Sequence, residues 1–157
     1  MRHDHPFITA GTPLTPRDAV VAIVCVGDRY LLQHRDSKPE IFFPDHWGFF
    51  GGAIEDGETP EECLLREFAE ETNLVADKDD LTFFTELTFD FRFADGTIIL
   101  RSFFELTIDP ALVEKIVLRE GQDFGLFTTE EALADLRLAP YDSFALWAHA
   151  RRQRFIF

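Results

Sequence analysis

Residues 52–74 read GAIEDGETPEECLLREFAEETNL, and this stretch decides the interpretation of the whole chain. Glu67, Glu70 and Glu71 follow one another at i, i+3 and i+4, so a helix would present all three carboxylates along one edge. Carboxylates this close repel one another unless a cation lies among them. Mg²⁺ prefers oxygen ligands and shares its coordination with substrate phosphates. The stretch therefore predicts a magnesium site that acts on phosphate groups.

The helix that carries these carboxylates has clear start signals. Thr59 suits the N-cap, Pro60 suits the first helical position, and Glu62 stands where a capping box needs it. We expect the helix to continue to about Thr72. Its apolar side, which we expect to face the core, comprises Leu64, Leu65 and Phe68.

Two glycines precede the helix. Gly51 and Gly52 allow a tight turn that brings a bare backbone carbonyl close to a ligand. Glu58 and Arg66 are placed to brace the acidic edge through charge-assisted hydrogen bonds. Glutamates at helical spacing usually mean only a solvated helix face. Joined to Gly52, Glu58 and Arg66 at these spacings, they favour a functional site.

The stretch resembles the Nudix box, which reads glycine, five residues, glutamate, seven residues and then Arg-Glu-apolar-x-Glu-Glu-x-Gly-apolar. Every defined position is met except one, where Asn73 replaces glycine. Asn is the usual substitute at a left-handed position after a helix, so we expect only a small loss of stability. Phe50 is a second departure, because many relatives carry proline there. We expect Phe50 to leave the metal ligands intact and to shape the adjacent substrate pocket.

The resemblance implies a single α/β domain over residues 1–157 with the Nudix fold, a mixed β-sheet sandwiched between helices. It also implies an enzyme that hydrolyses phosphoanhydride bonds with Mg²⁺, for which Mn²⁺ can substitute. The implied metal ligands are Glu67 and Glu71, with Glu70 assisting and the backbone carbonyl of Gly51 completing the set. Glu58 would act through water or through Arg66.

A second motif also matches the family. In MutT-type members, a glutamate in a loop that reads Glu-Gly-Gln contributes to the active site. The same tripeptide occurs here as Glu120, Gly121 and Gln122. An ordinary surface turn would have the same sequence, so the functional reading of Glu120 is a hypothesis. The choice of general base stays open, and the candidates for a catalytic role are Glu58, Arg66, Glu70 and Glu120.

The substrate is less constrained. Markers of the ADP-ribose type (a downstream proline) and of the dinucleoside-polyphosphate type (a tyrosine) are both missing between Leu74 and Pro110. The remaining resemblance is to MutT-type enzymes, which cleave a purine nucleoside triphosphate, oxidised or not, to the monophosphate and pyrophosphate. Asp142 falls where such enzymes read the purine edge, although a plain N-cap explains it equally well. The alternatives are a hydrolase of nucleotide sugars or other diphosphates, and a module that senses nucleotides without cleaving them. The intact box glutamates disfavour the sensor.

The composition limits the kinds of molecule that the protein is expected to bind. The chain has 157 residues and a formal net charge of −14, which argues against binding a nucleic acid polymer. We expect a small-molecule partner, with monomer and homodimer both open. Cys25 and Cys63 lack metal or redox spacing and suit buried positions in a reducing compartment. No stretch is long and apolar enough for a membrane span and the N-terminus is no signal peptide, so we expect a cytoplasmic location, with residues 1–16 extended or partly disordered.

The rest of the chain predicts strands and helices around the acidic helix. Residues 18–26 are typical of a buried strand, and Gly27 and Asp28 turn the chain into a second strand. Asp95 and Gly96 predict another turn. We expect further strands at 29–35, 81–93, 97–108, 115–118 and 124–127. We also expect a helix capped by Thr128 and Glu131 that runs to Leu136, and a last helix that starts at Asp142 or Ser143.

Overall fold

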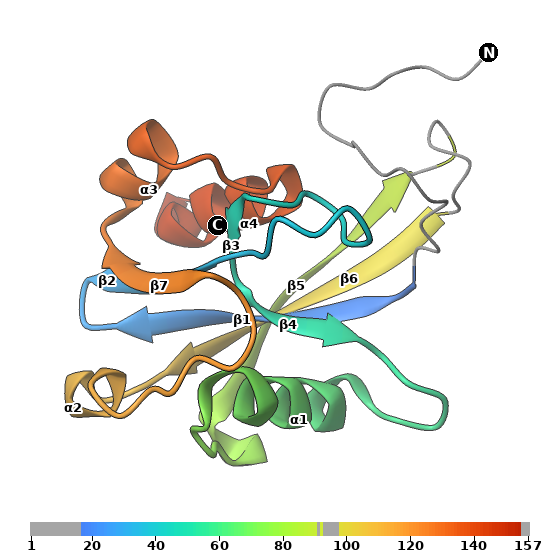
Figure 1. Ribbon diagram of the computed structural model, residues 1–157, viewed down its shortest axis with the longest axis horizontal. Helices are drawn as coiled ribbons and strands as arrows, with labels where there is room; N and C mark the ends of the chain where they lie inside the picture. Colours follow the sequence, from blue (N-terminus) through green and yellow to red (C-terminus); the bar gives the residue numbers. More distant parts are fainter. Residues whose placement is uncertain (1–16, 91, 93–97, 155–157) are drawn as a thin grey trace.

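A mixed β-sheet with helices on both faces forms the centre of the molecule (Figure 1). The computed structural model describes residues 17–90, 92 and 98–154. The strands are β1 (Ala19–Val26), β2 (Arg29–His34), β3 (Trp47–Gly48), β4 (Phe50–Ala53), β5 (Leu81–Asp90), β6 (Ile98–Thr107) and β7 (Asp123–Phe127). The helices are α1 (Pro60–Thr72), α2 (Pro110–Val113), α3 (Thr129–Asp135) and α4 (Pro140–Ala150), with 3₁₀ helices at Lys78–Asp80 and Arg152–Arg154.

Strand β1 lies at the centre of the sheet. It runs parallel to β6 and antiparallel to β2 and β4, in the strand order β3-β2-β1-β6-β5, with β7 paired to β2. Residues 24–26 of β1 pair with β2, whereas residues 19–22 pair with β4. The two strands therefore share one edge of β1 and diverge along it.

Alternate residues of β1 pack into two hydrophobic cores, one on each face of the sheet, because successive side chains of a strand point to opposite faces. Val20, Ala22 and Val24 pack against α1 through Leu64 and Phe68. Val21 and Ile23 pack on the opposite face against α3 and α4 through Ala132, Ala145 and Leu146. The helices thus cover both faces, which confirms the predicted sandwich.

Helix α1 matches its predicted bounds and caps. The Thr59 side chain accepts a hydrogen bond from the Glu62 amide, and the Glu62 carboxylate accepts one from the Thr59 amide at 2.9 Å. Asn73 ends the helix in the left-handed conformation, with φ 65°. Its Oδ1 also accepts a hydrogen bond of 2.9 Å from Arg119, which the sequence did not indicate.

Several predicted elements differ from the structure. The strand expected at residues 115–118 is wrong. These residues form no strand and follow the short helix α2, which was not predicted. The last helix begins at Pro140 with Ala139 as N-cap, so Asp142 and Ser143 lie inside it and neither is the cap. The glycine-rich segment before α1 pairs as β3 and β4.

Two predictions, the extended segment 1–16 and the turn at Asp95 and Gly96, fall outside the described residues. Within the described part of the chain, none of the helices has the length and apolar character needed to cross a membrane.

Candidate active site

A cleft of ≈ 390 Å³ lies where β2 and β4 diverge. Its acidic wall contains Gly51, Gly52, Glu67, Glu71 and Glu120. Its other lining side chains include Gln33, Arg35, Ile99, Arg101 and Tyr141. The cleft therefore brings the end of α1, the glycine pair and the Glu120 loop to one place.

Glu71 is the most buried carboxylate of the acidic helix, with 4% of its surface exposed. Its two oxygens accept hydrogen bonds from the Gln33 side chain (3.1 Å) and from the Gly51 amide (2.9 Å). Burial raises the pKa of Glu71 to about 8, and the nearby carboxylates of Glu120 and Glu67 act in the same direction. Because desolvation disfavours the charged form, the ionised carboxylate needs a neighbouring cation at neutral pH.

Glu67 is held beside Glu71 by a clamp of charged side chains. Arg66 donates to Glu67 at 2.7 Å and makes a two-pronged ion pair with Glu58 at 2.8 and 2.9 Å. The bond from Arg66 is the main reason that the pKa of Glu58 falls to about 2. Burial raises the pKa of Glu67, although Arg66 opposes that shift. Glu58 therefore orients Glu67 through Arg66, which is one of the two expected routes.

Close contacts leave no room for a side chain at Gly51 or Gly52. Gly51 has φ 140°, and a Cβ there would overlap the backbone of Val20 and Val21 in β1. A Cβ on Gly52 would overlap the Glu67 carboxylate. Without these side chains, the backbone of β4 approaches the glutamates of α1 directly.

Glu120 is carried into the cleft by a loop that is bonded on both sides. The Arg119 amide donates to the Glu71 carbonyl at 2.9 Å, and the Gln122 amide donates to the His34 carbonyl at 2.7 Å. Gly121 has φ 89°, and a Cβ there would meet the His34 carbonyl oxygen at 2.9 Å. The loop therefore ties α1 to β2 and leaves the exposed Glu120 facing Glu71 and Glu67.

Glu70 and Phe50 lie outside the cleft lining. The side chain of Glu70 is 64% exposed and approaches only the clamp, with its Oε2 3.6 Å from Arg66. Phe50 is fully buried in the core under α1, where its ring meets Phe68 edge to face. The expectation that the Phe50 side chain forms the pocket wall is therefore corrected: β4 turns that side chain toward the core.

Asp142 lies behind the cleft and is 1% exposed. Its Oδ2 accepts a hydrogen bond of 3.2 Å from the Phe49 amide, and its Oδ1 lies 3.8 Å from Arg101. Arg101 in turn stacks over Tyr141, with 3.8 Å between the guanidinium carbon and the ring centroid. Asp142 thus reaches the cleft through Arg101.

Gln33, Arg35, Arg101 and Tyr141 are among the lining residues that the sequence reasoning missed. A polar side chain that directly follows an apolar run in its strand was the available signal for Gln33 and Arg101. Among the described residues, Nε of both arginines and Oδ1 of Asp142 are buried without a hydrogen-bond partner. Both guanidinium groups therefore contain one unsatisfied donor, although the two arginines line the cleft through other atoms of their side chains.

The donor set of the acidic wall fits a hard cation. Carboxylates of Glu67 and Glu71, the exposed Glu120 and a backbone carbonyl at Gly51 are all oxygen ligands, as Mg²⁺ requires. The buried Glu71, which needs a positive neighbour to ionise, is the observation in this structure that supports the fit.

Comparison with known proteins shows similarity to one protein family over most of the chain. The sequence profile of the NUDIX domain matches residues 15–153. A MutT protein from Methanosarcina mazei superposes with a TM-score of 0.71 at 17% identity, covering 90% of this chain and 96% of that one. The E. coli dihydroneopterin triphosphate pyrophosphohydrolase gives 0.68 at 21% identity, with 90% and 99% covered. A C. elegans Ap4A hydrolase gives 0.62 at 18% identity, with 88% and 100% covered.

Proposed function

The chain belongs to the NUDIX domain family, and from that premise we propose that it is a pyrophosphohydrolase that cleaves a purine nucleoside triphosphate to the monophosphate and pyrophosphate with Mg²⁺. The single observation that carries the proposal is the buried Glu71, held beside Glu67 and Glu120 in the cleft. The proposed setting is the reducing cytoplasm, where both cysteines, which are free in the structure, stay as thiols.

The residues of the acidic wall divide the work of phosphoanhydride hydrolysis. Glu67, Glu71 and the Gly51 carbonyl would hold the cation, which supplies positive charge to the transferring phosphoryl group. Glu58 and Arg66 keep Glu67 in position through the ion pair described above. Glu120 lines the cleft and would accept the proton of an attacking water. Glu70, which is more exposed, would assist Glu67 and Glu71 in binding the cation from the edge of the helix.

The opposite wall is proposed to hold the nucleoside. Tyr141 offers an aromatic face, and Arg35 and Arg101 offer donors to base or sugar oxygens. Asp142 is proposed to act on the purine through Arg101, which it anchors. Two of the neighbours above are named for different substrates, dihydroneopterin triphosphate and Ap4A, and the likeness of all three to this chain extends to the fold alone.

The two arginines also favour a second candidate. The positively charged side chains of Arg35 and Arg101, which line the cleft, suit the hydroxyl-rich or anionic part of a nucleotide sugar or another diphosphate, with the same acidic wall performing the hydrolysis.

A substrate panel tests the proposal. The metal-free protein is supplied with Mg²⁺ or Mn²⁺ and assayed on purine and pyrimidine triphosphates, oxidised purine triphosphates and nucleotide sugars, with separate detection of pyrophosphate and phosphate. We expect the highest kcat/KM on a purine triphosphate, with pyrophosphate released and no turnover after chelation. Preferred turnover of a nucleotide sugar would select the second candidate, and no turnover of any diphosphate would refute hydrolysis.

A further inference from the structure

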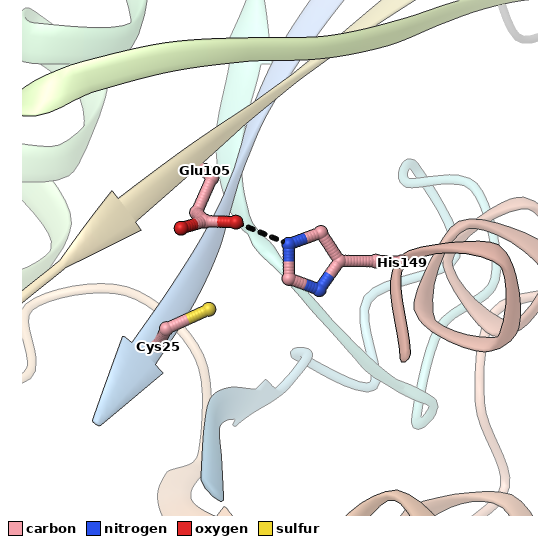
Figure 2. Close-up of side chains that lie close together, drawn as sticks. All are labelled: Cys25, Glu105 and His149. Atoms are coloured by element: carbon pink, nitrogen blue, oxygen red, sulfur yellow. Dashed lines mark hydrogen bonds and ion pairs between the residues drawn. The ribbon is translucent and has the colours of Figure 1, made fainter. Parts of the chain in front are cut away.

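A second group of side chains lies far from the cleft. Cys25 stands near the end of β1, Glu105 in β6 and His149 near the end of α4, and their ligand atoms lie within 4.8 Å of one another. Figure 2 shows the three side chains converging from these three elements. Ala19, at the other end of β1, lines the cleft. Cys25 lies six residues further along the strand, which corresponds to ~20 Å.

The histidine of this group is already oriented for ligation. His149 is fully buried, and its Nε2 faces Glu105 at 2.6 Å (Figure 2). Without a cation, Nε2 carries the proton toward Glu105 and Nδ1 accepts a hydrogen bond of 2.9 Å from the Tyr30 hydroxyl. With a cation on Nε2, the proton would move to Nδ1, which would donate to the Tyr30 hydroxyl oxygen. Burial lowers the pKa of His149, and the neutral imidazole is the form that binds metals. A second partner on the far nitrogen is the usual way in which a ligating histidine is fixed.

The group also has room for a ligand. A pocket of ≈ 360 Å³ lies beside the three side chains, and Gly27, Asp28 and Thr107 contribute to its wall. Its lining residues are different from those of the cleft. A cation held by three protein ligands would keep an open position toward this pocket, as in sites that bind an exchangeable water.

We propose that Cys25, Glu105 and His149 form a separate binding site for a thiophilic divalent cation such as Zn²⁺. The donor set decides the choice of cation, because a sulfur, a nitrogen and an oxygen ligand suit Zn²⁺ and exclude Mg²⁺ as a preferred occupant. Binding would join β1, β6 and α4, whereas the hydrogen bonds of His149 to Tyr30 and Glu105 connect α4 only to β2 and β6.

Two features of the site oppose binding of a cation. Burial, reinforced by Glu105, raises the pKa of the Cys25 thiol to about 11, so binding must release a proton. Arg152 lies 3.4 Å from the Glu105 carboxylate and 3.2 Å from His149 Nδ1, and its positive charge competes with the cation. The Arg152 side chain is 42% exposed, which leaves it free to turn toward solvent.

Cobalt(II) is the probe that separates this site from the acidic cleft. The metal-free protein is titrated with Co²⁺ in the presence of excess Mg²⁺, which occupies oxygen-ligand sites, and with a phosphine as reductant. Absorption from thiolate-to-cobalt charge transfer then reports sulfur ligation directly. We expect a band that saturates at one equivalent and is displaced by Zn²⁺, together with a rise in the melting temperature.

Variants identify the ligands. Cys25→Ser should abolish the band, whereas Cys63→Ser, which removes the other thiol, should retain it. Glu105→Gln should weaken Co²⁺ binding by about ten-fold or more, and Arg152→Ala should strengthen it. Melting curves without metal establish that each variant is folded. A wild-type protein that gives no sulfur band, or a band that survives Cys25→Ser, would overturn the proposal.

Discussion

Glu71 combines two properties that set its behaviour: it is almost completely buried, and both its oxygens accept hydrogen bonds. Glu71→Gln keeps the volume of the side chain but removes the charge that balances the cation. We expect the variant to fold and to lose more than ten-fold in kcat at saturating Mg²⁺, which is ~1.4 kcal/mol of transition-state stabilisation. Glu61→Gln is the matched control, since Glu61 lies on the same helix outside the cleft lining. Activity above a tenth of wild type would contradict the assignment of Glu71 as a ligand.

The raised pKa of Glu71 also predicts how stability depends on pH without metal. Below the ordinary glutamate pKa of 4.5 the side chain is protonated in both the folded and unfolded states, so it has no effect. Between pH 4.5 and about 8 the unfolded state releases the proton while the folded state keeps it, and wild-type stability falls by up to ~1.4 kcal/mol per pH unit. The amide of Glu71→Gln does not titrate.

Urea denaturation in a chelator checks this dependence. The variant should gain stability over wild type as the pH rises from 5 to 8, and Mg²⁺ should reduce the difference. Titration of the groups that do not interact with Glu71 cancels in the comparison. A difference that stays constant over this range would show that Glu71 does not hold its proton in the folded state.

Asn73 departs from the Nudix box, and its left-handed conformation is the reason that the departure is tolerated. Asn73→Gly relieves the Cβ penalty but removes an exposed hydrogen bond to Arg119 and adds entropy to the unfolded chain. These effects oppose one another, so we expect unfolding free energy within ~1 kcal/mol of wild type and an unchanged kcat. Thermal denaturation that shows a larger loss would mean that the Arg119 bond orders the Glu120 loop.

At the scale of elements, the loop of residues 119–122 positions a glutamate by backbone contacts. Gly121→Ala would place a Cβ at φ 89°, against the His34 carbonyl, and would displace Glu120. We expect kcat to fall by about ten-fold with a stability loss of ~1–2 kcal/mol. Gly27→Ala is the control, because Gly27 also has positive φ (61°) but nothing lies within 4 Å of its added Cβ. An equal loss of activity in both variants would exclude positioning by this loop.

At the scale of the whole molecule, Asp142 joins three parts of the chain. It lies in α4, accepts a hydrogen bond from the segment between β3 and β4, and pairs with Arg101 of β6. Asp142→Asn keeps an acceptor for the Phe49 amide and removes the charge that orients Arg101. We expect KM for purine triphosphates to rise about ten-fold while kcat is spared, because the contact is remote from the reacting phosphorus.

Comparison of kcat/KM on purine and pyrimidine triphosphates tests this role, alongside melting curves. Tyr141→Phe, which keeps the aromatic ring under Arg101, is the control and should behave as wild type on both. An equal loss of kcat/KM on both substrate classes would mark Asp142 as a structural residue of α4.

The sequence alone determined the parts of this protein that depend on neighbours along the chain. The bounds and caps of α1 follow from Thr59, Pro60 and Glu62, and the left-handed Asn73 follows from its place after the helix. Strand β1 and the helix capped by Thr128 were also predictable, because local periodicity and capping chemistry are written in consecutive residues.

Only the tertiary structure decided which side chains meet in the cleft. Gln33 and Arg35 come from β2 and the residues just after it, Arg101 from β6 and Tyr141 from α4, and these parts are so distant in sequence that no local pattern could join them. The same reason applies to Phe50, whose direction was set by the pairing of β4 with β1. It applies also to Cys25, Glu105 and His149, because strand register and helix packing bring them together across more than a hundred residues of chain.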